Sequence, residues 1–366
     1  MEKIIKKKQM KRNILLLGGT GAMGTHLAQI LQNSNYNVYI TSRSNRKNKD
    51  NIKFIKGNAH DEIFLNSILC QKDWDIIIDF MIYSSTEFRK KIDKLLNSCK
   101  QYVFLSSARV YANSKCKLTE NSPRLLDVCT DSEYLYTDEY ALSKAREENI
   151  LLKSANKNWT IIRPYITYSE TRLQLGVLEK EYWLYQALHH RTIVFSKDIA
   201  NKRTTLTYGY DVARGIASIL GEKGAFGEIF HITTEENYTW QEIFDLYIRI
   251  IEKELGFKPK VKIIDENPHI KIKGHGWQVK DDRYYNRSFD NNKIGKYIDI
   301  KSFKPTLEGL EQCLKYFIHN PSFRITGWSD FAMYDRIIGE WTPLSEIPTL
   351  KNKIKYLLRR TIIPLK

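Results

Sequence analysis

Apolar runs alternate with helically spaced apolar positions along the first half of the chain. The first run, at 14–17, is followed by three glycines and then by apolar residues at helical spacing over 22–31. Similar runs predict further strands at 37–42, 52–55, 76–81, 102–107 and 159–164. Helical patterns lie between them at 62–70, 90–98 and from 138 onward. Regular alternation of strand and helix predicts a parallel, doubly wound sheet with helices on both faces.

This rhythm is lost from about Ser169 onward. The later patterns predict a helix at 175–190, a return to the sheet at 203–213 with a helix to 220, a strand at 228–232, a long amphipathic helix at 240–255, and two closing helices at 289–294 and 304–317. We therefore expect a second, smaller lobe to follow the doubly wound domain.

Glycines between the first strand and helix have the spacing G-x-x-G-x-x-G at Gly18, Gly21 and Gly24. Such a turn lets backbone N–H groups approach a pyrophosphate and lets the helix pack close to the sheet. An ordinary strand–helix turn that contains glycines is the alternative. The residues predicted to bind a dinucleotide here are Gly18, Thr20, Gly21, Ala22, Met23 and Gly24.

The end of the second strand bears on which dinucleotide binds. A carboxylate there accepts hydrogen bonds from the adenosine ribose, but this chain has Ser42 and Arg43. A guanidinium suits a 2′-phosphate, so the sequence favours NADP(H), with NAD(H) as the alternative. A solvated basic loop is the other interpretation of these residues. Asn58, after the third strand, is placed to pair with the adenine edge.

Composition narrows the class of protein. The formal net charge is +16, but the lysines are scattered and no nucleic-acid-binding module is present, so we expect no nucleic-acid partner. The five cysteines form no C-x-x-C pair, and no apolar run reaches the length of a membrane span. The lysine-rich lead-in at 1–12 lacks the apolar region of a secretory signal. We predict a cytoplasmic protein without a metal site.

A candidate acid–base group lies in the helix that begins near 138. Tyr140 and Lys144 are four residues apart, so both project from one helical face. A neighbouring ammonium stabilises a phenolate and makes tyrosine a usable acid or base near neutral pH. Ser107, at the end of the fifth strand, could hydrogen-bond the same substrate oxygen. A surface pair on the helix is the alternative.

The order of these motifs resembles the extended short-chain dehydrogenase/reductase (NAD-dependent epimerase/dehydratase) family, whose members mostly act on nucleotide sugars. The resembling segments are G-x-x-G-x-x-G, S-S-A-R-V-Y, Y-A-L-S-K, I-I-R-P-Y and the stretch 203–213. The resemblance implies a Rossmann sheet and a smaller C-terminal α/β substrate lobe. It places the dinucleotide-binding domain at 1–168 (re-entered at about 204–232), the substrate lobe at 169–203 and 233–320, and a basic, aromatic-rich extension at 321–366.

The resemblance also implies roles for individual residues. Ser107, Tyr140 and Lys144 correspond to the catalytic set, and Lys144 would also hold the nicotinamide ribose. Further residues implied to line the cofactor site are Ala59, Phe80, Tyr165 and Ile166. Substrate contacts are implied for Arg109, Arg203, Arg283 and Arg287, with surface charges as the alternative for the last three. The partners expected are a nucleotide-linked sugar and a second copy of the chain in a homodimer.

Within that family, 4,6-dehydratases carry an Asp-Glu pair where this chain has Ala108 and Arg109, so dehydration is disfavoured. Arg43 favours an NADPH-dependent reductase acting on a carbonyl of a nucleotide-activated sugar or a sugar-derived polyol precursor, in surface polysaccharide synthesis. A nucleotide-sugar epimerase with tightly bound NAD(P) is the alternative, and a non-catalytic nucleotide-binding regulator is a third hypothesis.

Two features of the sequence are compatible with more than one interpretation. Arg109 either meets a substrate phosphate or pairs with the acidic loop at 112–137. The tail carries six Lys or Arg residues at 351–366 and no acid there, together with Trp328, Phe331, Tyr334 and Trp341. We expect it to pack within the protein or its dimer. Membrane contact is the less favoured alternative.

Overall fold

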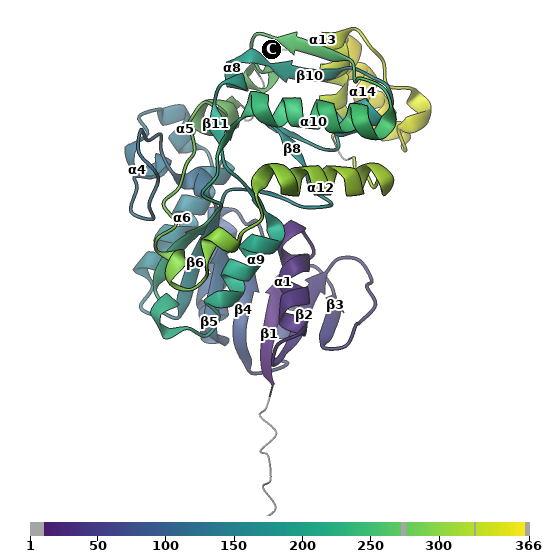
Figure 1. Cartoon of the computed structure of the whole chain (residues 1–366). Coiled ribbons are helices and arrows are strands. Elements are labelled where there is room, and N and C mark those ends of the chain that lie inside the picture. The colour runs from purple at the N-terminus through teal and green to yellow at the C-terminus, as the bar shows by residue number, and fades with distance from the viewer. Residues whose placement is uncertain (1–10, 272–275, 326, 363–366) are drawn as a thin grey trace, which may run out of the picture.

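The computed structural model describes residues 11–271, 276–325 and 327–362. Seven parallel strands form the main sheet in the order β13-β6-β5-β4-β1-β2-β3 (Figure 1). Their bounds are β1 Arg12–Leu17, β2 Tyr36–Ser42, β3 Ile52–Lys56, β4 Trp74–Asp79, β5 Cys99–Leu105, β6 Trp159–Pro164 and β13 Glu228–Ile232. The doubly wound parallel sheet predicted from the sequence is confirmed.

Helices cover both faces of this sheet, because its strands are apolar on both sides. Ile14 and Leu16 of β1 face the cluster formed with α1 (Ala22–Gln32) and α9 (Gly209–Ser218), which lie side by side in Figure 1. Leu15 and Leu17 face the opposite cluster. The helices of that second face are α2 Glu62–Leu69, α3 Ser85–Asn97 and α6 Tyr140–Lys153.

The second lobe has its own apolar core, which is built on α10 (Trp240–Leu255) and α12 (Thr306–His319). Its other elements are β7 Ile166–Tyr168, β8 Gln174–Leu175, β9 Leu178–Glu179, α7 Trp183–Leu188, β10 Ile193–Ser196, α8 Lys197–Ala200, β11 Arg203–Thr204, β12 Leu206–Tyr208, β14 Tyr238–Thr239, β15 Val261–Ile264 and α11 Gly276–Gln278. Two short helices, α4 Leu125–Val128 and α5 Ser132–Tyr136, interrupt the predicted polar loop.

Helices α13 (Trp328–Ile338) and α14 (Leu350–Thr361) form the C-terminal extension. Trp328, Phe331 and Tyr334 are buried, so the expected packing of these aromatics within the chain is confirmed, whereas Trp341 is half exposed. No described helix combines the length and the apolar character needed to cross a bilayer.

Three predicted elements are wrong in part. Instead of one helix over 175–190, β8 and β9 form a hairpin around Gly176, whose φ of +61° interrupts a helix, and only α7 is helical. At 289–294, the Asp290 N–H donates to the Leu118 carbonyl, so tertiary pairing replaces the predicted helix. The return at 203–213 pairs β12 with β7 rather than with the main sheet. The lead-in at 1–10 and Lys366 lie outside the described residues.

The glycine turn sets how closely α1 approaches the sheet. A Cβ at Gly24 would lie 2.6 Å from the backbone carbon and oxygen of Gly19, which have no room to move aside. A Cβ at Gly21 would meet nothing within 4 Å among the described atoms. The two glycines therefore serve different purposes, one for packing and one for open space above the turn.

We expect Gly24→Ala to lower the free energy of unfolding by about 1–3 kcal/mol, because the clash exceeds the gain of about 1 kcal/mol in helix propensity. Gly21→Ala is the matched control and should cost less than about 1 kcal/mol. Urea unfolding of both variants measures this difference. Equal stability of the two variants would contradict the packing role of Gly24.

Candidate active site

A cleft of about 470 Å³ lies at the carboxyl ends of the central strands, between the sheet and the second lobe. Parallel α/β sheets bind ligands at this edge, where the turns that follow the strands converge. The predicted site residues that line the cleft are Gly18, Gly21, Ala22, Met23, Gly24, Phe80, Ser107, Arg109, Tyr140, Lys144, Tyr165, Ile166 and Arg283. The structure thus brings the predicted catalytic residues and the glycine turn to one place.

The glycine turn has the features that a dinucleotide pyrophosphate requires. Gly18 has a φ of +73°, and its N–H donates to the Thr41 hydroxyl at 3.0 Å. Helix α1 begins after Gly21, and within the described residues no side chain caps it. Its first N–H groups therefore remain available to an anionic ligand, with the positive end of the helix dipole behind them. Together with the open space above Gly21, these features fit a dinucleotide.

Tyr140 and Lys144 reach the cleft from the first turn of α6. The helix begins at Tyr140, and the Glu139 side chain caps it by accepting from the Ala141 N–H at 2.8 Å. Ser107 also lines the cleft, and its hydroxyl oxygen accepts from the Arg109 N–H at 3.2 Å. A phenol, an ammonium and a hydroxyl therefore line the same cleft.

The Lys144 ammonium is buried and has close partners. It lies 3.0 Å from a Glu147 carboxylate oxygen, donates to the Met81 carbonyl at 3.3 Å, and lies 4.4 Å from the centre of the Phe104 ring. Glu147 is fully buried and also accepts from the Ser143 hydroxyl at 3.1 Å. Burial raises the pKa of Glu147 to about 7, although Lys144 acts in the opposite direction.

Asp79 places a second buried carboxylate near this pair. Burial raises its pKa, against hydrogen bonds from the Met81 N–H and from the hydroxyls of Tyr102 and Tyr83 at 2.9, 2.8 and 3.1 Å. Asp79 and Lys144 also influence each other electrostatically. The cation at the base of the cleft is thus surrounded by two carboxylates, which the sequence analysis did not identify. Asp79 carries a sequence signal, because it is the one acidic residue in the apolar run 76–81, whereas Glu147 stands among charged residues and carries none.

Arg109 lies between acidic partners. Its guanidinium is 2.7 Å from Glu139 and 4.0 Å from Asp282, and its carbon lies 5.4 Å from the centre of the Tyr140 ring. Arg109 thus has acidic partners, but they are Glu139, two residues beyond the predicted loop at 112–137, and Asp282, rather than a residue of the loop itself. The side chain also lines the cleft, where it is close to Tyr140.

The other predicted substrate arginines differ in position. Arg283 lines the cleft and donates to the Gly176 carbonyl at 2.9 Å. Arg287 is buried outside the lining, donating to Asp282 and to the carbonyls of Tyr111 and Ala112. Arg203 is exposed and donates to the Asn237 carbonyl at 2.8 Å.

Residues predicted to select the cofactor lie beyond the lining of the cleft. Ser42 is buried at the end of β2, and Arg43 is exposed after it. The Asn58 side-chain oxygen accepts from the His60 N–H at 3.2 Å, and Ala59 is buried with its carbonyl accepting from Lys91. Thr20 lines a neighbouring hollow of about 480 Å³ that shares Gly21 and Ala22 with the cleft.

The hairpin of the second lobe forms an unpredicted wall of the cleft. Arg172 and Gln174 both donate to Glu179 at 2.8 Å, and all three line the cleft. No motif marked them, because the sequence has no strand–helix rhythm there.

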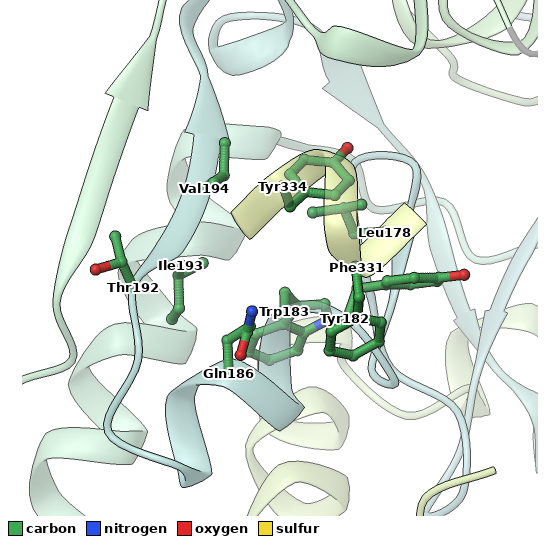
Figure 2. Close-up of a pocket in the computed structure, with 9 residues that line it drawn as sticks. All are labelled: Leu178, Tyr182, Trp183, Gln186, Thr192, Ile193, Val194, Phe331 and Tyr334. Carbon is green, nitrogen blue, oxygen red and sulfur yellow. The ribbon is translucent and has the colours of Figure 1, made fainter. Parts of the chain in front are cut away.

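A much smaller pocket of about 20 Å³ lies between α7, β10 and α13 (Figure 2). Tyr182, Trp183 and Phe331 are among its lining residues, and neither Ser107 nor Tyr140 reaches it. Its volume suits about one water molecule, so it is a packing gap between the lobe and the extension.

The raised pKa of Glu147 predicts a pH effect on stability. A folded-state pKa of about 7, above the ordinary 4.5, means that the folded protein holds this proton more tightly than the unfolded chain. Stability from this group is therefore present below pH 4.5 and lost as the pH rises to 7. Relative to Glu147→Gln, we expect the wild type to lose about 3 kcal/mol of unfolding free energy across that range. Urea unfolding between pH 4.5 and 8 measures it, with the exposed Glu133→Gln as control. Parallel pH profiles of wild type and Glu147→Gln would contradict the assignment.

Known proteins share this architecture. A family model, NAD dependent epimerase/dehydratase family, matches residues 14–233. The chloroplast stem-loop binding protein of 41 kDa b from Arabidopsis thaliana is 26% identical over 274 residues, covering 70% of this chain and 67% of that protein. A trifunctional UDP-glucose 4,6-dehydratase/UDP-4-keto-6-deoxy-D-glucose 3,5-epimerase/UDP-4-keto-L-rhamnose-reductase from the same plant is 23% identical over 88% of this chain. The chain spans about half of that relative's length (48%).

Solved structures agree in fold. An epimerase from Methanothermobacter thermautotrophicus superposes with a TM-score of 0.66 at 18% identity, covering 85% of this chain and 93% of that one. The UDP-glucuronic acid 4-epimerase of Bacillus cereus, solved with UDP-glucuronic acid and NAD, gives a TM-score of 0.63 at 19% identity, covering 85% and 100%. Because the family model spans more than half of the chain, this protein belongs to the NAD-dependent epimerase/dehydratase family and is an oxidoreductase of the extended short-chain dehydrogenase/reductase type.

Proposed function

We propose that the protein is an NADPH-dependent reductase that converts a carbonyl of a nucleotide-activated sugar, or of a sugar-derived polyol precursor, to an alcohol in surface polysaccharide synthesis. The observation that carries the choice of reduction is the end of β2, where Ser42 and the exposed Arg43 stand in place of a carboxylate. A cationic side chain there favours a cofactor with a 2′-phosphate, and cells use NADPH as a consumable hydride donor.

Different residues of the cleft would bind the cofactor and transfer the proton in this reaction. The glycine turn and the N-terminus of α1 would hold the pyrophosphate, with Lys144 on the nicotinamide ribose. When bound, the nicotinamide supplies a hydride to the carbonyl carbon. Tyr140 donates its proton to the carbonyl oxygen, Ser107 hydrogen-bonds that oxygen, and the phenol is reprotonated from solvent. The Lys144 ammonium stabilises the phenolate, and the Glu147 carboxylate partly offsets the positive charge of that ammonium.

Arginines on the lobe side of the cleft suit the anionic part of such a substrate. Arg172 and Arg283 both line the cleft, and guanidinium groups bind diphosphates through charge-assisted hydrogen bonds. Several similar structures were solved with UDP-glucuronic acid, UDP-glucose or NAD, which supports a nucleotide sugar as ligand.

Epimerisation of a nucleotide sugar is the second candidate function. It is favoured by the family match and by similar structures that hold NAD, and it needs the same Tyr140 as acid and base. The two functions differ in one respect: a reductase consumes its cofactor, whereas an epimerase returns the hydride and consumes none.

A panel of UDP- and dTDP-linked ketosugars with NADPH tests the reaction. We expect the nicotinamide absorbance near 340 nm to fall with wild-type protein, and Tyr140→Phe to slow turnover at least about 100-fold by removing the proton donor. The matched control is Tyr136→Phe, which changes a 95% exposed tyrosine four residues earlier in the sequence, at the end of α5. A new sugar epimer without loss of absorbance would establish the epimerase instead. Unchanged turnover in Tyr140→Phe would refute the assignment of the acid.

Cofactor selectivity tests Arg43 separately. We expect Arg43→Ala to weaken NADPH binding about tenfold, because one charge-assisted contact is lost, and to leave NADH binding unchanged. Isothermal titration with each nucleotide measures both affinities. Arg89→Ala, an exposed arginine on α3, is the control. Equal loss for the two nucleotides, or none for either, would remove the argument for NADP(H).

A further inference from the structure

The inner face of α14 is fixed against the rest of the extension. The buried Tyr356 hydroxyl donates to Asp335 at 2.6 Å and accepts from the Thr342 N–H at 2.9 Å. On the next turn, Arg360 donates to the Glu340 carbonyl at 3.2 Å and lies over the Trp341 ring. These contacts set the rotation of the helix and so determine which side chains point outward.

The outer face of α14 carries an apolar stripe. Leu350, Ile354 and Leu358 are spaced four residues apart and therefore lie along one side of the helix, and Ile362, the C-terminal cap residue, continues the same spacing. Their exposed fractions are 73%, 48%, 41% and 70%. A continuous row of large aliphatic side chains rarely remains exposed to water, so this stripe indicates a surface that binds an occupant, either a partner molecule or a membrane.

The charge of the helix identifies that occupant. The segment 350–361 contains Lys351, Lys353, Lys355, Arg359 and Arg360 and no acidic residue. Lys351 and Lys355 are exposed and border the stripe. A helix with an apolar face, a polar face and only positive charge has the pattern of helices that lie in the plane of an anionic bilayer.

Two other occupants fit this face less well. A second copy of the chain, related by a two-fold axis, would bring the same cations against one another without an acid to pair them. A nucleic acid would place its charged phosphates against the aliphatic side chains at the centre of this face, which cannot bind them. An anionic lipid surface satisfies both parts, since acyl chains cover the stripe and headgroups meet the lysines.

We propose that the exposed face of α14 binds the surface of an anionic membrane, with the apolar stripe at the acyl boundary and Lys351 and Lys355 among the headgroups. Buried Trp328, Phe331 and Tyr334 hold α13 and thereby the extension to the second lobe. Figure 1 places the extension on the outside of that lobe, away from the seven-stranded sheet. This face would therefore hold the enzyme at the membrane surface, whatever reaction its cleft catalyses.

Vesicle sedimentation of the full chain tests the proposal. We expect binding to vesicles of phosphatidylglycerol and phosphatidylcholine, and weak binding to phosphatidylcholine alone. Ile354→Ser with Leu358→Ser should lower the partition coefficient about tenfold, because less apolar area enters the bilayer. Lys351→Glu with Lys355→Glu should lower it more than about tenfold on anionic vesicles.

Matched controls separate this face from the general basic charge. Ile63→Ser replaces an 83% exposed isoleucine on α2, and Lys90→Glu with Lys94→Glu reverses two exposed lysines four residues apart on α3. Each control should bind as the wild type does, and circular dichroism checks that every variant is folded. Absence of binding to anionic vesicles would overturn the proposal. Equal losses of vesicle binding in the stripe variants and the controls would also overturn it, because they would indicate that the +16 net charge alone causes binding. A dimer in solution that only the stripe variants disrupt would overturn it as well, because it would indicate that a second copy of the chain covers the stripe.

Discussion

Parallel pairing of seven strands is the constraint on which the cleft depends. Since the strands run in one direction, the turns after β1, β4, β5 and β6 all open at the same edge of the sheet. Residues separated by more than a hundred positions, such as Gly18 and Tyr140, meet there without any direct sequence signal between them. The second lobe then closes the edge and converts it into a cleft.

Burial of charge beneath the cleft is the main electrostatic feature of the site. The Lys144 ammonium, nearly inaccessible to water, is stabilised by Glu147 at 3.0 Å rather than by solvent. A buried carboxylate and ammonium each lose hydration, which their mutual attraction and hydrogen bonds must offset. Farther along the same helix, Glu148 accepts from Arg163 of β6 at 2.7 and 2.8 Å. Helix α6 is therefore fixed to the sheet by charges on its inner side.

The sequence was sufficient wherever a local rule determined the structure. Periodicity predicted the strands of the sheet, and the glycine spacing predicted the turn into α1, where Gly24 is required for close packing against Gly19. The sequence was insufficient where contacts between residues far apart in the chain determine the structure. The pairing of Leu118 with the segment near Phe289 depends on a tertiary contact between distant parts of the chain. Arg172 and Glu179 reach the cleft only because the second lobe folds over it.

The cap of α6 has a consequence for ligand binding. Glu139 caps the helix at Ala141 and also pairs with Arg109, so one carboxylate serves both the helix terminus and a cation of the cleft. An anionic ligand that attracts Arg109 competes with this carboxylate and changes the electrostatic balance at the first turn, where Tyr140 lies. Ligand affinity and conformational order at the reactive phenol are then thermodynamically linked, and the linkage acts equally in both directions.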